Sequence, residues 1–579
     1  MKEAFIHIKW FFKQEWKSYV FCAIILLIVS IVPLIPSKVL GSAIDALSMG
    51  TLTIILLAQY LVILVLCPLL IYILNIFYHY LINKLGHNLS FTLREKYIEH
   101  LFEMDAELYE KYTKGDLISR ATNDLNGITT LATGFLQQVI YFTTTIIGAI
   151  GMMIYISPIL TLASISFMPI VIYFLNKKRL EKRQYYQTHH EIYGKMTESV
   201  LESIEGIKTV RAYCNEEMDY DKTKIAIEND VDSWWKIQKF ESIFGPLFEL
   251  VYIVAYFIAI GLGSYLVIHG EVSPGNLVTY LVYVGTLYGP LIGLSNILNV
   301  MNSIVISDKR FYEIMDTNPS VVDSEKPLEI KTFKTLDFDD VSFKYPFEDL
   351  MILKNISFSI KNGETIGIVG PTGSGKSTLI RQILREFNVV SGSIKINGID
   401  IKEYKLDDVR KLIGYVPQNH ILFRRSVKDN ILIGNLQATK EDVTKAMKMA
   451  DFEKDLKELT NSSSTMIAEL GESLSGGQKQ RLSIARALVS NPEILILDDS
   501  LSAVDALTES NIINQLKENR KGKTNIIIAH RFSAVESADK VIVIQDGRIT
   551  DMASPSDLLE YDNWYKEQYY KQRKGSIYE

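Results

Sequence analysis

The chain has 579 residues, too many for one ordinary domain, and 48% of them are hydrophobic, a high share for a soluble protein. Its net charge of −6 is modest, and no part of the chain is a basic domain of the kind that nucleic-acid binding requires. Cys22, Cys67 and Cys214 show no metal-binding or redox spacing. These properties predict several domains, contact with a membrane and no nucleic-acid partner.

Residues 1–17 form an amphipathic segment in which aromatic residues alternate with lysines. Trp10 and Trp16 lie near Lys9 and Lys13. Aromatic side chains beside lysines are typical of a helix in the membrane interface, and an ordinary soluble helix is the alternative. The next apolar run is too long for a signal peptide and lacks a small-residue cleavage site, so we interpret it as an anchor.

Six apolar runs follow, each long enough or nearly long enough to cross a bilayer, which takes about 20 residues. They are residues 19–36, 52–78, 131–156, 159–175, 243–268 and 277–298. Lysines and arginines gather before the first run, between the second and third, after the fourth and after the sixth. By the positive-inside rule, these connections and both termini are cytoplasmic. The pattern predicts six transmembrane helices.

Two of the cytoplasmic connections are longer than a loop needs. Residues 80–130 and 176–242 carry helical periodicity and many charges, which predicts helical extensions of the membrane spans. Each pair of extensions must reverse direction, and residues 104–112 and 214–220 are the expected turns. Such turns are placed to contact a cytoplasmic domain.

Residues 316–335 are interpreted as a linker because they contain Asn318-Pro319, acidic and polar residues and Pro327. The composition then becomes that of a soluble α/β domain, so we expect a membrane domain over residues 1–315 and an α/β domain over residues 336–579. Strands are expected at residues 336–343, 352–360, 366–369, 393–396, 413–416, 494–497, 524–528 and 540–545. Strands that alternate with helical segments predict a largely parallel sheet.

A P-loop motif lies between a predicted strand and a predicted helix. It consists of Gly370, Pro371, Thr372, Gly373, Ser374, Gly375, Lys376 and Ser377, and Thr378 follows it. A glycine-rich turn before a helix leaves backbone N–H groups free to bind phosphate oxygens. We expect Lys376 to reach the outer phosphates and the Ser377 hydroxyl to bind Mg²⁺.

Two further motifs refine this site. Residues 494–497 form an apolar run that ends in Asp498, where a second oxygen ligand for Mg²⁺ is needed. Leu474 begins a second glycine-rich segment, followed by a predicted helix whose start can face an anion. The rest of this segment consists of Ser475, Gly476, Gly477 and Gln478.

With these motifs in this order, the whole chain resembles an ATP-binding cassette (ABC) exporter half-transporter, in which six membrane spans are fused to one nucleotide-binding domain. The resemblance implies ATP and Mg²⁺ as cofactors and a multi-pass location in a bacterial cell membrane. In this family each ATP lies between one domain's P-loop and the other domain's Leu-Ser-Gly-Gly-Gln signature. The resemblance therefore implies a second half-transporter as partner, and it makes the turns at residues 104–112 and 214–220 the coupling helices.

The resemblance also assigns single residues. Tyr345 matches the aromatic residue that stacks on adenine, with a core tyrosine as the alternative, and Gln418 matches the glutamine that reaches Mg²⁺. Glu469 matches the glutamate that meets the partner's coupling helix. Residues 502–505 match the loop between the two nucleotide domains, and His530 matches the histidine at the γ-phosphate, with a structural histidine as the alternative.

The chain departs from the family pattern after Asp498. The next residue is normally the glutamate that orients the attacking water, and here it is Asp499. Aspartate is one methylene shorter, and a displacement of about 1 Å can cost about 10²-fold in rate. We interpret this as a degenerate site that binds ATP but turns it over slowly. Heterodimeric bacterial multidrug exporters resemble this pattern, and harmless variation is the alternative.

The spans are rich in aromatic and aliphatic residues, which suits lipophilic substrates. Glu249 is an exception within the fifth run, where a carboxylate favours cationic substrates if it faces the interior. A structural hydrogen bond is the alternative. A homodimeric lipid or peptide exporter with slow hydrolysis, or an ATP-gated regulatory subunit, remains an alternative function, whereas six spans exclude a DNA-associated ATPase.

Overall fold

The computed structural model describes residues 1–166, 168–244, 246–468 and 471–575. Contacts between residues divide the chain into two compact units. The helical unit comprises Met1–Glu99 and Gly115–Asp316, and the α/β unit comprises His100–Lys114 and Thr317–Glu579. A short segment from the first of the two long connections therefore belongs with the α/β unit.

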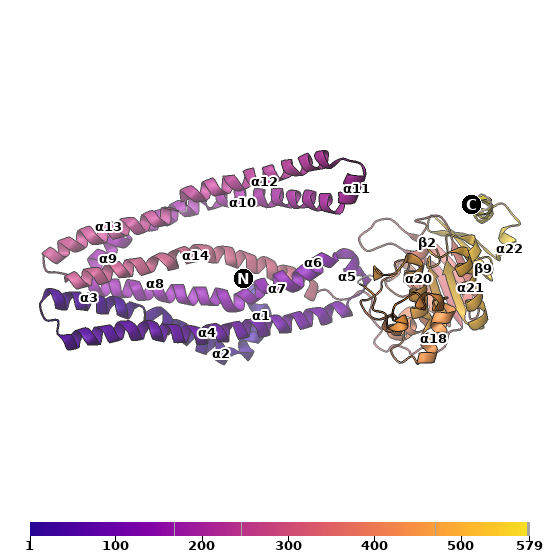
Figure 1. Cartoon of the computed structure of the whole chain (residues 1–579), viewed down its shortest axis with the longest axis horizontal. Helices are drawn as coiled ribbons and strands as arrows, with labels where there is room; N and C mark the ends of the chain where they lie inside the picture. The colour runs from indigo at the N-terminus through magenta and orange to yellow at the C-terminus, as the bar shows by residue number, and fades with distance from the viewer. Residues whose placement is uncertain (167, 245, 469–470, 576–579) are drawn as a thin grey trace. The chain divides into compact units, whose positions relative to one another are not determined.

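Long helices joined by short turns make up the helical unit (Figure 1). Two π-helical turns, Arg120–Asp124 and Leu131–Phe135, lead into α8. The helices are α1 (Lys2–Gln14), α2 (Trp16–Ile31), α3 (Leu34–Ser48), α4 (Ile54–Glu103), α6 (Lys114–Ser119), α7 (Leu125–Thr130), α8 (Leu136–Ile156), α9 (Pro158–Ile165), α10 (Met168–Glu205), α11 (Ile207–Ala212), α12 (Glu216–Phe244), α13 (Pro246–Ile268) and α14 (Pro274–Met315).

The N-terminal helix α1 is amphipathic, as its sequence predicts. Ala4, Ile8 and Phe11 are buried and lie on one face at helical spacing. His7 on the same helix lies 3.0 Å from the Asp308 carboxylate of α14. Contacts along this face hold α1 against α14.

Three helical stretches among the described residues are long and apolar enough to span a membrane. They are Trp16–Ser48, Ile54–Glu103 and Lys114–Ile156, and a shorter apolar helix covers Tyr252–Ile268. The predicted runs at residues 159–175 and 243–268 each include one residue outside the described ranges. The total of six spans remains a prediction.

The long connections are helical, as expected. α4 continues without a break to Glu103, and α10 and α12 lie side by side (Figure 1). The first reversal lies at α5 (Ala106–Lys111), inside the predicted turn. The second reversal uses α11 and the residues after it, where Cys214 has a φ of 53°. It therefore begins earlier than predicted, because α10 already ends at Glu205.

Two sheets form the α/β unit. A six-stranded sheet has the order β10-β9-β3-β8-β7-β6, and a four-stranded sheet has the order β2-β1-β4-β5. The strands are β1 (Thr335–Phe343), β2 (Leu353–Lys361), β3 (Thr365–Val369), β4 (Ser391–Ile396), β5 (Ile399–Asp400), β6 (Ile413–Val416), β7 (Ile494–Asp498), β8 (Thr524–Ile528), β9 (Lys540–Gln545) and β10 (Arg548–Ala553).

The helices of this unit are shorter. They are α5, α15 (Lys376–Ile383), α16 (Leu406–Lys411), α17 (Val427–Leu432), α18 (Lys440–Met449), α19 (Glu453–Leu456), α20 (Gly476–Leu488), α21 (Ala506–Asn519), α22 (Pro555–Leu558) and α23 (Trp564–Gly575).

The predicted single sheet is therefore only partly right. Strands β9, β3, β8, β7 and β6 run parallel, whereas β10 pairs antiparallel at the edge. Strands β1, β2, β4 and β5 pair antiparallel in their own sheet. No described helix lies between β1 and β2, and a parallel crossover needs a connection long enough for one.

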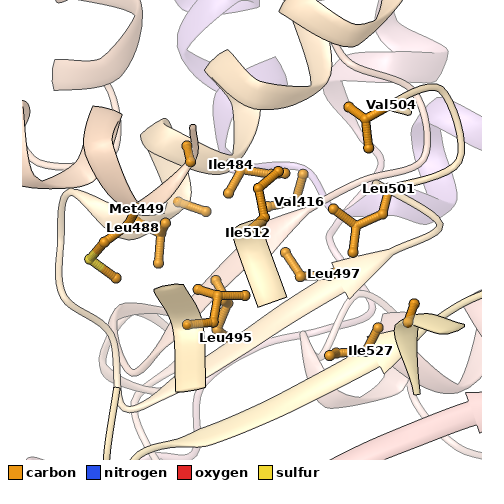
Figure 2. Packing of buried hydrophobic residues seen from close by; sticks show 14 of the residues in the cluster. Val416, Met449, Ile484, Leu488, Leu495, Leu497, Leu501, Val504, Ile512 and Ile527 are labelled. Atoms are coloured by element: carbon orange, nitrogen blue, oxygen red, sulfur yellow. The ribbon is translucent and has the colours of Figure 1, made fainter. Parts of the chain in front are cut away.

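The buried strand β7 carries the core on both of its faces. Leu495 and Leu497 join one hydrophobic cluster, and Ile494 and Ile496 join the other. Figure 2 shows the first cluster, in which these leucines pack among side chains from α20 and α21. Because successive side chains of a strand point to opposite faces, β7 is buried on both sides. It lies between the parallel strands β8 and β6, and Asp498 is its last residue.

Candidate nucleotide-binding site

The P-loop lies between β3 and α15, as predicted. Gly375 immediately precedes the helix with a φ of 101°, a left-handed conformation that favours glycine. The Lys376 ammonium donates hydrogen bonds to the carbonyl oxygens of Gly370 at 2.9 Å and Pro371 at 2.8 Å. The lysine is therefore folded over its own loop, where phosphate oxygens are expected.

Two buried polar groups in this loop fit a phosphate. Lys376 is only 7% exposed, and burial lowers the pKa of its ammonium although Asp499 and Asp498 oppose the shift. The buried Ser374 hydroxyl has no hydrogen-bond partner among the residues that the structure describes. Phosphate oxygens would satisfy this hydroxyl and stabilise the charged lysine.

The carboxylate at the end of β7 faces the P-loop helix. Asp498 is 2% exposed, and its Oδ1 accepts a 3.0 Å hydrogen bond from the Ser377 hydroxyl. The Tyr415 hydroxyl on β6 lies 3.5 Å from its Oδ2. Burial, reinforced by the neighbouring Asp499, raises the pKa of Asp498 against the Ser377 hydrogen bond. A buried carboxylate beside a hydroxyl is an all-oxygen donor set that suits Mg²⁺.

Asp499 lies beside this carboxylate in a left-handed conformation with a φ of 48°. The Gln418 side-chain amide donates to its Oδ2 at 3.4 Å. The structure thus brings together Lys376, Ser377, Asp498, Asp499 and Gln418, although they come from three separate stretches of sequence.

We expect Gly370→Ala to abolish ATP binding and Gly373→Ala to weaken it only modestly. A Cβ on Gly370 would lie 2.0 Å from the Ile544 carbonyl oxygen, which is backbone and cannot move aside, whereas a Cβ on Gly373 meets open space. The left-handed Gly373, with a φ of 80°, would cost about 1–2 kcal/mol as alanine. Titration of each full-length variant with an ATP analogue measures both effects. Equal losses in the two variants would contradict this prediction.

Tyr345 lies beside α15, the helix that follows the P-loop. Its hydroxyl lies 3.1 Å from the Thr378 hydroxyl and accepts from Arg381 at 3.2 Å. Its ring meets the rings of Phe343 and Phe387 with centroids 5.1 and 5.5 Å away. The side chain is half-buried, which leaves part of the ring open to a ligand.

The signature segment begins helix α20. Ser475 caps the helix: its hydroxyl accepts from the Gln478 N–H at 3.3 Å, and the Gln478 side chain accepts from the Ser475 N–H at 3.0 Å. A Cβ on Gly477 would lie 3.2 Å from the Arg481 guanidinium, and one on Gly476 would touch Ala503. Among the described residues, no hydrogen bond joins this segment to the P-loop.

The remaining predicted residues lie outside the cluster around Lys376. His530 follows β8 with an exposed side chain, and its carbonyl oxygen accepts from Gln572 at 2.7 Å. Asp505 caps α21, and the hydrogen bonds from Thr508 lower its pKa to about 2. Glu469 lies outside the described residues.

Our reading of the sequence missed two charged residues near these motifs. Arg481, one turn beyond Gly477, makes a buried bidentate pair with Asp455 at 2.7 and 2.6 Å. Arg381 on α15 bonds Tyr345 and also reaches Glu110 of α5. A position one turn into a phosphate-binding helix was the only signal for Arg381, since Tyr345 and Glu110 are distant from it in sequence.

The α5 segment contacts the rest of the α/β unit through the side chains of Asp105 and Glu110, among others. Asp105 caps α5 through Oδ1, while its Oδ2 accepts from the Ser320 hydroxyl at 2.8 Å and from the Val321 N–H at 2.9 Å. The second contact is the 2.8 Å ion pair between Glu110 and Arg381. The first predicted turn therefore contacts both the linker and the P-loop helix.

Comparison with known proteins agrees with this architecture. Residues 19–291 match the ABC transporter transmembrane region, and residues 353–502 match the ABC transporter domain. The chain is 39% identical over 568 residues to the probable multidrug resistance ABC transporter ATP-binding/permease protein YheI of Bacillus subtilis (strain 168), covering 97% of both chains. It is 31% identical over 575 residues to the multidrug resistance-like ATP-binding protein MdlA of Escherichia coli (strain K12), covering 99% of this chain and 97% of that one.

Among solved structures, a bacterial Atm1-family ABC exporter with ATP bound superposes with a TM-score of 0.83. The superposition covers 96% of this chain and 99% of that chain. At 24% identity, this likeness supports the fold alone.

Membrane-type helices and a P-loop α/β unit define a membrane protein driven by a nucleoside triphosphate. The chain belongs to the ABC transporter family, as an exporter whose transmembrane domain is fused to an ATP-binding cassette. It is a multi-pass membrane protein and an ATPase-coupled transporter, and its cassette binds ATP. Exporters of this family act as dimers. The predicted family and fold class are confirmed.

Proposed function

We propose that this chain is one half of a heterodimeric exporter of lipophilic compounds, and that its own ATP site is degenerate. Asp499 carries this proposal, because a carboxylate one methylene short stands beside Asp498 where a general base is needed. We also propose that this chain completes the partner's ATP site. The signature helix α20, capped by Ser475, supports this part of the proposal. The names of the two multidrug-type relatives support a lipophilic substrate.

In this proposal, residues 370–378 bind the phosphates of ATP and Tyr345 stacks on its adenine. Ser377, Gln418 and Asp498 would hold Mg²⁺, which neutralises phosphate charge. Asp499 and His530 would contact the attacking water and the γ-phosphate. The signature residues 475–478 would contact ATP on the P-loop of the partner.

The same proposal gives the chain its place in the cell membrane. Residues 1–315 form the membrane domain, residues 316–335 the linker and residues 336–579 the cassette. Both termini and the cassette lie on the cytoplasmic side, which the distribution of lysine and arginine supports.

Dye efflux from membrane vesicles tests the proposed function. We expect ATP-dependent efflux of a lipophilic dye when this chain is present with a candidate partner half-transporter, and little efflux with either chain alone. Lys376→Ala in this chain should weaken ATP binding at its own site. Full efflux by this chain alone would contradict the heterodimer, and movement of a labelled phospholipid in place of the dye would favour the lipid exporter.

Glu249 on α13 is expected to favour cationic substrates. The Tyr288 hydroxyl donates to its Oε1 at 3.3 Å, and the Tyr252 ring lies 5.2 Å from the Tyr288 ring. Tyrosine faces beside a carboxylate attract organic cations. Glu249→Gln should therefore lower efflux of a cationic dye several-fold relative to a neutral dye, whereas Glu271→Gln, in the exposed turn before α14, should change neither. Equal transport of both dyes by Glu249→Gln would contradict this expectation.

A further inference from the structure

Arg381 joins three parts of the α/β unit through one guanidinium. Its three nitrogens donate to three different side chains: the Glu110 carboxylate of α5 at 2.8 Å, the Glu386 carboxylate at 2.7 Å and the Tyr345 hydroxyl at 3.2 Å. The arginine lies on α15, one turn beyond the phosphate-binding residues. A planar guanidinium with all its nitrogens occupied has little freedom to rotate.

The Arg381 guanidinium is one of several groups that hold Tyr345 in place. Besides the Arg381 bond, its hydroxyl bonds Thr378, and its ring is bounded by the rings of Phe343 and Phe387. Arg381 also stacks over the Phe387 ring at 4.8 Å from its centroid. Displacement of Arg381 would leave the Tyr345 hydroxyl bonded to Thr378 alone and would let the angle of its ring change.

Glu110 belongs to a segment that has further hydrogen bonds to the α/β unit. It lies near the end of α5, and Asp105 at the start of the same helix is bonded to Ser320 and Val321. Leu108 between them is 3% exposed. The segment His100–Lys114 therefore contacts the cassette as one piece, and Glu110 is its direct link to the P-loop helix.

We propose that Arg381 is a positioning residue that couples attachment of the α5 segment to the orientation of Tyr345. When the α5 segment is attached, it holds Arg381 toward Tyr345, so the adenine site is formed. When the segment is detached, Arg381 bonds only Glu386. By thermodynamic reciprocity, adenine bound against Tyr345 must stabilise the attachment by the same factor. This inference rests on the proposed contact of Tyr345 with adenine.

The test compares ATP with inorganic tripolyphosphate, which has the phosphates but no adenine. Binding of each is measured to the purified full-length chain. We expect Glu110→Gln to weaken ATP binding about two- to five-fold, the size of an ion pair whose acidic partner is 46% exposed, and to leave tripolyphosphate binding unchanged. In an Arg381→Gln background, Glu110→Gln should have no further effect.

Glu107→Gln is the matched control. It lies on the same short helix, and its carboxylate makes no ion pair with a described residue. It should leave both affinities unchanged. Equal weakening of ATP and tripolyphosphate by Glu110→Gln, or additive losses in the double variant, would overturn the proposal because they would indicate a general structural role.

Tyr345→Ala tests the proposed adenine contact separately from the proposed role of Arg381. If it leaves ATP binding unchanged relative to tripolyphosphate, the proposed adenine contact is wrong and the coupling fails with it. If Tyr345→Ala weakens only ATP binding while Glu110→Gln leaves ATP binding unchanged, the adenine contact stands and the proposed role of Arg381 is wrong.

Discussion

Replacing Asp499 with glutamate is expected to raise ATP turnover at this chain's own site by up to about 10²-fold when the chain is paired with its partner. Glutamate extends the carboxylate by one methylene, toward the position where an attacking water would lie. The side chain starts from a fixed place, because the Asp499 N–H donates to the Ile528 carbonyl oxygen at 3.0 Å. Single-turnover hydrolysis, with the transporter in excess over ATP, measures the effect without contributions from product release.

Asp499→Asn is the control for this prediction. It preserves the size of the side chain but removes the negative charge, so turnover should fall further while ATP binding persists. Asp499 has a positive φ, which aspartate and asparagine adopt more readily than glutamate, so thermal stability of the Asp499→Glu chain must be measured alongside. Hydrolysis by the unaltered single chain at ordinary exporter rates would show that the site is not degenerate.

Removal of the Asp455 carboxylate is expected to destabilise the cassette by about 3–5 kcal/mol, since it leaves a buried guanidinium without its partner. The side chains of Arg481 and Asp455 are only 9% and 5% exposed. Arg481 also lies against Gly477, so Asp455→Ala should disturb the signature and reduce hydrolysis at the partner's site. Thermal unfolding of the full chain and ATPase activity of the pair measure the two consequences.

An exposed ion pair supplies the control. Lys395 and Asp339 lie 2.6 Å apart with side chains 39% and 53% exposed, so Asp339→Ala should cost little stability. Replacing both buried partners, as Asp455→Leu with Arg481→Met, should recover much of the lost stability because no charge remains buried. Similar losses for the buried and exposed pairs would contradict the prediction.

Local patterns in the sequence identified the separate motifs of this transporter. Glycine spacing and the hydrophobic strand before it identified the P-loop, and the apolar run before Asp498 identified the strand that carries the carboxylate. These signals are local, because turn geometry and strand burial depend on neighbouring residues. Length, hydropathy and charge likewise identified the long helices.

The arrangement of these motifs in space became visible only in the folded structure. It separated β1, β2, β4 and β5 into an antiparallel sheet, because strand pairing depends on contacts between distant residues. It joined Asp455 to Arg481 and Glu110 to Arg381, which lie 26 and 271 residues apart in the chain. A lone charged residue carries no sign of its partner in the sequence; only folding brings the two charges within hydrogen-bond distance.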